Sequence, residues 1–204
     1  MCGIAGVFHF DRTREVNGRA LKSMTDVIHH RGPDGEGFFL ENNIGLGHRR
    51  LSIIDLHTGD QPMFSDDRKK ILVFNGEIYN YIELREELIK KGYKFRTDSD
   101  TEVVIKAYEE WGYECQNKFN GMWAFALWNK DKDELFLSRD RLGEKPLHYG
   151  VFEDTLLFGS EIKSFFAYGM PKVPQLELLE IYTVYKSIPA PYTFFKEIND
   201  FLWI

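Results

Sequence analysis

The residue with the most reactive chemistry is Cys2, which directly follows the initiator methionine. Cysteine is small enough for cellular aminopeptidase to remove Met1, which would leave Cys2 with a free α-amine close to its thiol. An α-amine has a pKa near ~7.7–8.0 and a thiol near ~8.5. One residue would then provide both a nucleophile and a partly neutral base, as in acyl transfer by N-terminal nucleophiles. The alternative interpretation is that Cys2 is a small buried side chain at the start of a strand.

Five further segments combine polar side chains with glycine or proline at the expected ends of apolar elements. Such positions are where binding and catalytic residues concentrate. They cover residues 31–37, 48–50, 75–77, 99–100 and 139–146. Each also has a structural interpretation on its own: a rigid loop at 31–34, a surface arginine at Arg50, a hairpin turn at Asn75-Gly76, a helix cap at Asp100, and a cross-strand ion pair between Arg139 and Asp140.

The six histidines do not form a metal-binding pattern. None stands in an H-E-x-x-H motif or in a cysteine–histidine spacing typical of zinc, so we expect no metal site. A thiol–imidazole pair between Cys2 and one of these histidines stays open as an alternative. The sequence also contains neither G-x-G-x-x-G nor G-x-x-x-x-G-K-[ST], so no phosphate loop is predicted.

The bulk composition indicates one domain, or one domain with part of another, in a chain of 204 residues. A formal net charge of -6 argues against a nucleic-acid-binding protein. No stretch approaches the ~20 apolar residues that span a bilayer, and no secretory signal is present. With only two cysteines, Cys2 and Cys115, a disulfide framework is not expected, and we predict a cytoplasmic protein.

The periodicity of apolar residues predicts a layered α+β domain. Strands are expected at 4–10, 38–40, 44–48, 51–54, 71–74, 122–128, 135–138, 147–151 and 155–158, with helices at 18–29, 80–92 and 99–112. The strand at 71–74 is expected to stop at Asn75-Gly76. Strands followed by helices and then again by strands favour sheets that pack together under a cover of helices.

Six strings in chain order together resemble the class II glutamine amidotransferase domain. They are M-C-G-I-A-G at 1–6, H-R-G-P-D at 30–34, H-R-R-L-S-I-I-D at 48–55, N-G-E-I-Y-N at 75–80, S-D-T-E at 99–102 and R-D-R-L-G at 139–143. Among such families, the sequence is most similar to the glutamine-hydrolysing asparagine synthetases. The resemblance implies an N-terminal-nucleophile hydrolase fold, a four-layer sandwich of two antiparallel sheets between helices, and it assigns residues 1–170 to the glutaminase domain.

The resemblance also implies a role for each matching residue. Cys2 would attack the side-chain amide of L-glutamine with its own amine as base, release ammonia and form a thioester that water hydrolyses. The Asn75 side chain and the Gly76 N–H would form the oxyanion hole. Arg50 would bind the substrate carboxylate and Asp100 the substrate ammonium. The rest of the implied glutamine pocket comprises Leu51, Ser52, Ile53, Ile54 and Glu77.

One departure from the synthetases limits these implications. Their S-G-G-x-D-S pyrophosphate loop does not occur in this sequence, and residues 171–204 resemble only a linker and the start of the synthetase domain. We therefore expect no cofactor in this chain. ATP and magnesium would belong to a synthetase domain or to a partner subunit that supplies the ATP site. The ammonia acceptor stays open. One alternative is the glutaminase portion of another amidotransferase, and a second is a non-catalytic glutamine-binding or regulatory domain that kept the pocket but lost turnover.

The residues after Pro171 include large apolar side chains that nothing else in the sequence obviously covers. They are Leu176, Leu178, Leu179, Tyr182, Tyr185, Phe194, Phe195, Phe201, Leu202, Trp203 and Ile204. Contiguous apolar surface of this kind usually marks an interface. We therefore expect this tail to add little to the stability of the domain, and to be mobile or to pack against a second copy in a homo-oligomer.

Overall fold

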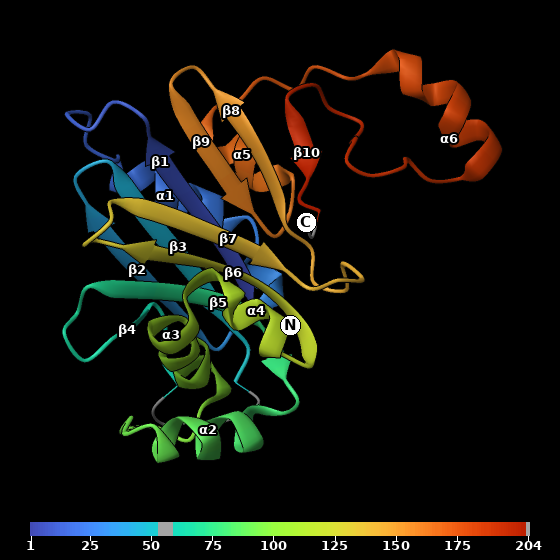
Figure 1. Ribbon diagram of the computed structural model, residues 1–204. Coiled ribbons are helices and arrows are strands. Elements are labelled where there is room, and N and C mark those ends of the chain that lie inside the picture. The colour runs from blue at the N-terminus through green and yellow to red at the C-terminus, as the bar shows by residue number, and fades with distance from the viewer. Residues whose placement is uncertain (53–58, 203–204) are drawn as a thin grey trace.

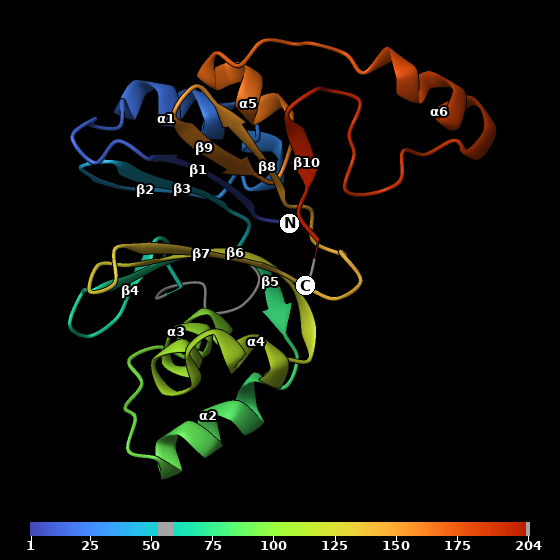
Figure 2. The same cartoon turned by 45° about the horizontal axis from the view of Figure 1, so that its top comes forward.

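Two antiparallel sheets lie face to face, and helices cover both outer surfaces (Figures 1 and 2). The computed structural model describes residues 1–52 and 59–202. The larger sheet has the strand order β10 (Ile198–Asp200), β8 (His148–Phe152), β9 (Thr155–Gly159), β1 (Gly3–His9), β3 (Ile44–Arg50) and β2 (Gly35–Glu41). The smaller sheet has the order β4 (Met63–Phe64), β5 (Lys70–Ile78), β6 (Gly121–Asn129) and β7 (Glu134–Arg139).

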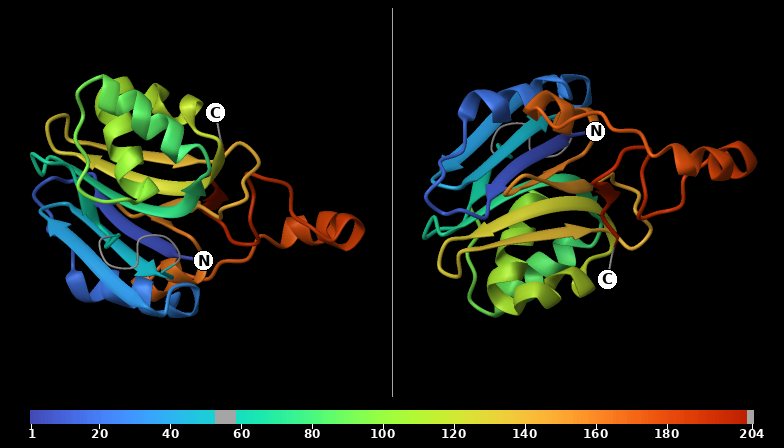
Figure 3. Two further views of the ribbon diagram at one scale, coloured as in Figure 1. Left: turned by 90° about the horizontal axis from the view of Figure 1, so that it is seen from below. Right: turned by 90° about the horizontal axis from the view of Figure 1, so that it is seen from above.

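The helices complete the outer layers, as the two views along the sheets show (Figure 3). The larger sheet carries α1 (Gly18–Asp26), η1 (His29–Arg31) and α5 (Lys163–Tyr168). The smaller sheet carries α2 (Tyr81–Lys90), α3 (Asp100–Trp111), η2 (Gly112–Glu114) and α4 (Cys115–Lys118). The remaining helices, η3 (Leu176–Leu178) and α6 (Leu179–Tyr185), project from the body of the molecule. The predicted α+β sandwich is confirmed.

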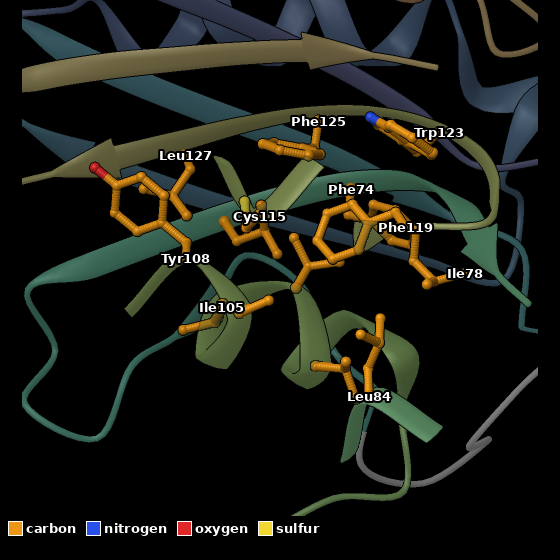
Figure 4. Packing of buried hydrophobic residues seen from close by; sticks show 14 of the residues in the cluster. Phe74, Ile78, Leu84, Ile105, Tyr108, Cys115, Phe119, Trp123, Phe125 and Leu127 are labelled. Carbon is orange, nitrogen blue, oxygen red and sulfur yellow. The ribbon is translucent and has the colours of Figure 1, made fainter. Parts of the chain in front are cut away.

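Alternation along the strands gives each sheet two apolar faces. On β5, Ile71 and Val73 face the larger sheet, whereas Leu72 and Phe74 face the helices. The cluster beneath α2, α3 and α4 is shown in Figure 4. A second cluster fills the space between the sheets, and a third lies under α1 and α5. Each sheet is therefore covered on both faces by apolar clusters.

Strand β5 is longer than the sequence predicts. It continues through Asn75 and Gly76 to Ile78, and β6 pairs with it along this whole length. The strand end predicted at residue 74, and the hairpin turn considered for Asn75-Gly76, are both wrong. Glycine permits this pairing, because a Cβ on Gly76 would lie 2.3 Å from the Met122 carbonyl oxygen. The predicted strand at 51–54 also fails at Leu51 and Ser52, which lie outside any strand.

The tail contributes to the folded domain. Ile198 is fully buried, and β10 pairs with β8 at the edge of the larger sheet. The aromatic ring of Phe201 packs on Tyr149 at 5.8 Å between centroids. The expectation that the tail is mobile or covered only by a second copy is therefore wrong for β10, whereas Trp203 and Ile204 lie outside the described residues. The division at residue 170 stays a prediction.

Within the described residues, no helix has the length and apolar character that crossing a bilayer requires. Across residues 1–52 and 59–202, no group of three or more histidine, cysteine, aspartate or glutamate side chains could hold a metal ion.

Candidate active site

A cavity of about 150 Å³ opens where β1 begins, between the ends of the two sheets. Its lining brings together most of the residues that the sequence singles out: Cys2, Arg50, Leu51, Asn75, Gly76, Glu77 and Asp100. Ser52 does not line the cavity. Ile53 and Ile54 lie outside the described residues. Seven predicted positions from four separate segments thus meet at one place.

The thiol of Cys2 is enclosed by the backbone that follows β3. The Leu51 N–H donates to Sγ at 3.3 Å, and Sγ lies 3.6 Å from the Leu51 carbonyl oxygen. The Arg31 Nε donates to the Cys2 carbonyl oxygen at 2.9 Å. Burial raises the pKa of the Cys2 thiol, although the Leu51 hydrogen bond and the Arg50 charge oppose this. The thiol is therefore protonated at neutral pH and needs a base to become a nucleophile.

Histidine does not provide that base in the described part of the chain. There, no hydrogen bond joins Cys2 Sγ to an imidazole. His48, on the neighbouring strand, uses its Nε2 for a 3.1 Å hydrogen bond to the Phe74 carbonyl oxygen. Burial lowers the pKa of His48 to about 4, so its ring is neutral and structural. A thiol–imidazole pair has no support among these residues.

Asn75 presents an amide group to the space between the sheets. Its position in β5 places the side chain on the same face as Val73, which packs in the cluster between the sheets. Among the described residues, its buried Nδ2 has no hydrogen-bond partner. A buried donor without a partner is costly in a folded protein. A ligand that accepts a hydrogen bond from Nδ2 would remove this cost.

The direction of the Gly76 N–H follows from the register of β5 and β6. Gly76 is opposite Trp123, whose N–H donates to Asp140 Oδ2 at 3.2 Å and whose carbonyl accepts from the Asp140 N–H at 2.8 Å. Trp123 therefore forms its backbone hydrogen bonds toward β7. In an antiparallel ladder, opposite residues alternate between hydrogen-bonded and non-hydrogen-bonded pairs. Gly76 and Trp123 form a non-hydrogen-bonded pair, so the Gly76 N–H points away from β6.

Two neighbouring N–H groups show what occupies that edge of β5. The Phe74 N–H donates to Gln61 Oε1 at 2.6 Å, and the Ile78 N–H donates to Asp100 Oδ2 at 3.0 Å. Gly76 lies between these two positions, and both Gln61 and Asp100 line the cavity. The Gly76 N–H thus faces the cavity beside the Asn75 amide. These two groups could both donate a hydrogen bond to a single oxygen.

Charges of both signs line the cavity. The Arg50 side chain is largely buried and its Nη1 lies 3.0 Å from Oδ1 of Asp60, whose side chain is exposed. Burial raises the pKa of Asp100 to about 6, despite hydrogen bonds from the Ile78 and Thr101 backbone, and the nearby Glu77 charge adds to the shift. A cationic ligand group at Asp100 would favour its ionised form.

The loop at residues 31–34 holds the segment that carries Arg50. The Asp34 N–H donates to the Arg50 carbonyl at 3.0 Å, and Asp34 Oδ2 accepts from the Ser52 N–H at 2.9 Å. A Cβ on Gly32 would lie 2.4 Å from the backbone of Arg49. The rigid-loop interpretation of these residues is therefore correct, and the loop also positions the walls of the cavity.

The lining residues that were not assigned to the site from the sequence include Gln61 and Lys145. Gln61 stands in no recognisable motif, so nothing local could have indicated it. Lys145 lies in the polar segment at 139–146, which was noted as a candidate without a role for this side chain.

Comparisons with known proteins give a consistent result. Residues 1–203 match the family model described as glutamine amidotransferase domain. The chain is 44% identical over 195 residues to the glutamine-hydrolyzing asparagine synthetase 1 of Bacillus subtilis, covering 95% of this chain and 31% of that protein. It is 40% identical over 166 residues to asparagine synthetase B of Escherichia coli, covering 80% and 30%. The chain thus spans about a third of the length of these relatives.

A solved structure supports the fold. The glutamine phosphoribosylpyrophosphate amidotransferase of Bacillus subtilis superimposes with a TM-score of 0.69, at 22% identity, over 85% of this chain and 45% of that one. At this identity the likeness shows a shared fold, which is the predicted N-terminal-nucleophile hydrolase sandwich.

Proposed function

This chain belongs to the glutamine amidotransferase domain family, and from that premise we propose that its cavity hydrolyses L-glutamine to glutamate and ammonia. One observation supports the reaction above the others. The cavity brings together the Cys2 thiol, the Gly76 N–H and an Asn75 Nδ2 that has no hydrogen-bond partner among the described residues. Attack on an amide carbonyl needs a nucleophile with donors placed for the oxygen that becomes negative.

We assign the first step to Cys2 after removal of Met1. Its free α-amine takes the thiol proton, and Sγ attacks the side-chain carbonyl carbon of glutamine. Asn75 Nδ2 and the Gly76 N–H stabilise the tetrahedral oxyanion. Collapse of this intermediate breaks the carbon–nitrogen bond, and the amine returns the proton to the departing ammonia. Water then attacks the thioester and releases glutamate.

The charged lining fixes the orientation of the substrate. Arg50 can offer a bidentate fork to the glutamine carboxylate. Asp100, with Glu77 beside it, is placed for the ammonium. Because both partners are largely buried, each would be costly to leave without its counter-charge once glutamine has entered. No cofactor takes part in this step.

The use of the ammonia is a proposal that rests on the relatives. Since the relatives at 40% and 44% identity are named as glutamine-hydrolyzing asparagine synthetases, we assign the ammonia to ATP-dependent amidation of aspartate. The ATP and magnesium sites would belong to a synthetase domain or subunit, and we place this step in the cytoplasm. Transfer to another acceptor, by the glutaminase portion of a different amidotransferase, is the second candidate.

Ammonia release from free glutamine tests the proposal. We expect turnover in protein whose intact mass lacks Met1, none in Cys2→Ala, and retained glutamine binding in that variant by calorimetry. A variant that keeps an N-terminal extension before Cys2 should fold but not turn over. Full activity with the extension in place would refute the role of the amine, and binding without turnover in the processed chain would indicate a non-catalytic domain.

A further inference from the structure

Lys145 carries a buried ammonium group that the proposed reaction does not yet use. The residue is only 6% exposed and lines the cavity together with Cys2 and Asn75. Among the described residues, no carboxylate lies within ion-pair distance of its Nζ. The contact of that atom is with the Met1 Sδ at 3.5 Å. A thioether is a weak acceptor, and a buried cation without a strong partner is unfavourable.

The segment at 139–146 is built to hold this lysine in place. The Asp140 carboxylate accepts hydrogen bonds from the backbone N–H groups of Leu142, Glu144 and Lys145 at 2.9–3.1 Å. It also accepts from the Trp123 N–H at 3.2 Å. The interpretation of Arg139 and Asp140 as a cross-strand ion pair is therefore wrong. The Asp140 oxygens instead accept hydrogen bonds from backbone N–H groups, mainly those of the turn.

Arg139 fixes the same turn from the other side. Its Nε donates to the Lys145 carbonyl at 2.7 Å and its Nη2 to the Gly143 carbonyl at 2.7 Å. Its Nη1 donates to the Phe201 carbonyl at 2.9 Å. Gly143 has φ +66, and a Cβ there would lie 3.0 Å from the Arg139 guanidinium. These hydrogen bonds fix the backbone of the turn from which the Lys145 side chain reaches the cavity.

We propose that Lys145 is a positioning residue that lowers the pKa of the Cys2 α-amine once Met1 has been removed. Loss of Met1 takes away the Sδ contact and creates a titratable amine in the same cavity. A nearby ammonium disfavours protonation of that amine, since two like charges would share a poorly solvated space. The amine is then more often neutral, and able to accept the thiol proton, at physiological pH.

Other charges around the amine must be weighed with Lys145. Arg31 and Arg50 add positive charge from η1 and β3, whereas Glu77 and Asp100 add negative charge from β5 and α3. Each of these two arginines forms an ion pair that offsets its charge, Arg31 with Glu161 and Arg50 with Asp60. Bound glutamine would further neutralise Asp100 and Arg50. Among the described residues, the Lys145 ammonium is thus the lining cation with no carboxylate within ion-pair distance, and the nearby Asp140 carboxylate accepts instead from the Lys145 backbone N–H at 3.0 Å.

The test follows the titration of the amine itself, so it does not depend on turnover. In processed protein labelled with ¹³C-cysteine, the Cys2 α-carbon resonance is recorded against pH, with the non-titrating α-carbon of Cys115 as internal reference. Since burial raises the thiol pKa, the first of the two macroscopic steps reports chiefly on the amine. Lys145→Met removes the charge at similar length, and Lys145→Arg retains it. Lys145→Gln replaces Lys145→Met if the latter does not fold.

We expect Lys145→Met to raise the first apparent pKa by about half a unit or more, and Lys145→Arg to restore it. The acidic limb of the kcat/KM profile should move by the same amount. Lys132→Met, which removes a charge from the turn between β6 and β7, should move neither. An unchanged first pKa in Lys145→Met would overturn the inference. The inference rests on the proposed function only for the reason why a neutral amine matters. If wild type releases no ammonia, the proposed function fails, while the titration still decides whether Lys145 lowers the pKa of the amine.

Discussion

At the residue scale, Asp100 is a carboxylate that the empty fold does not favour in its charged form. Its pKa of about 6, raised chiefly by burial, exceeds the ordinary value of 3.8. The folded state therefore binds this proton more tightly than the unfolded state does. As pH rises from about 4 through about 6, this group lowers the stability of the fold, and the loss persists above that range.

We predict that Asp100→Asn is more stable than wild type at pH 7.5, by about 1–3 kcal/mol. The amide oxygen can still accept the Ile78 N–H, while the charge penalty disappears. The advantage should shrink as pH falls from about 6 to about 4 and be absent below that range, and glutamine binding should be lost. Urea unfolding at both pH values and calorimetry measure these effects. An equal stability difference at both pH values would show that Asp100 is ionised without penalty.

Asn75 allows a separation of catalysis from folding. We predict that Asn75→Ala lowers kcat by about 10²–10³ and leaves KM nearly unchanged, because the lost donor acts only on the oxyanion. Asn129→Ala is the matched control on β6, where the Asn129 Nδ2 donates to the Tyr108 hydroxyl at 3.1 Å. The control should lose stability but not kcat. An unchanged kcat in Asn75→Ala would remove Asn75 from the oxyanion hole.

The ordered strings, through their resemblance to the amidotransferase family, were sufficient to place Cys2, Arg50, Asn75 and Asp100 in one site, and all four line the cavity. They could not identify Gln61, whose place at the cavity is set by a hydrogen bond to a strand 13 residues further along. Such a contact exists only after the chain has folded and leaves no local periodicity. The roles themselves remain predictions until variants are measured.

At the element scale, local signals and long-range pairing differed in how well they could be predicted. The start of α1 is fixed by Asn17, whose side chain accepts from the Arg19 and Ala20 N–H groups. Asparagine is among the preferred N-cap residues, so this helix start depends on local chemistry alone. The length of β5 is fixed by β6, which lies more than 40 residues later in the chain, so Asn75-Gly76 had the pattern of a turn but forms part of a strand.

Gly76 is the position where this pairing should be least tolerant. We predict that Gly76→Ala destabilises the fold by roughly 1–3 kcal/mol, because the new Cβ would clash with backbone atoms of Met122 and Trp123. Hydrolysis should fall with it, since the displaced N–H can no longer face the oxyanion. Thermal unfolding and ammonia release measure both effects.

The matched control is Gly159→Ala on β9, a second glycine within a paired strand. A Cβ there would make only ordinary contacts, the nearest at 3.5 Å from the Ile4 carbonyl oxygen. It should cost clearly less stability than Gly76→Ala. Equal losses in the two variants would mean that the close approach of β5 to β6 is not what requires a glycine at position 76.

At the scale of the whole molecule, the tail returns to the body after a long excursion. Gln175 N–H donates to the Phe194 carbonyl at 2.8 Å, and Lys196 N–H donates to the Val173 carbonyl at 2.9 Å, so the excursion begins and ends at one place. Between them, α6 has no buried residue. After it, β10 buries Ile198 against the larger sheet. The apolar tail residues therefore divide into a projecting part and a part of the core.

Because of this division, deleting the whole tail and replacing only its projecting part should have different effects on the melting temperature. Removing residues 171–204 should lower the melting temperature by about 5 °C or more, because burial of Ile198 alone is worth about 1.5–3 kcal/mol. Replacing residues 177–189 with a short Gly/Ser linker should change it by only about 1–2 °C, because these side chains are mostly exposed and the anchoring hydrogen bonds remain. Calorimetric melting and sedimentation of both variants provide the measurement. Equal melting temperatures for the two would mean that β10 adds nothing to the domain, whereas a linker variant as unstable as the full deletion would mean that α6 packs on the body in solution.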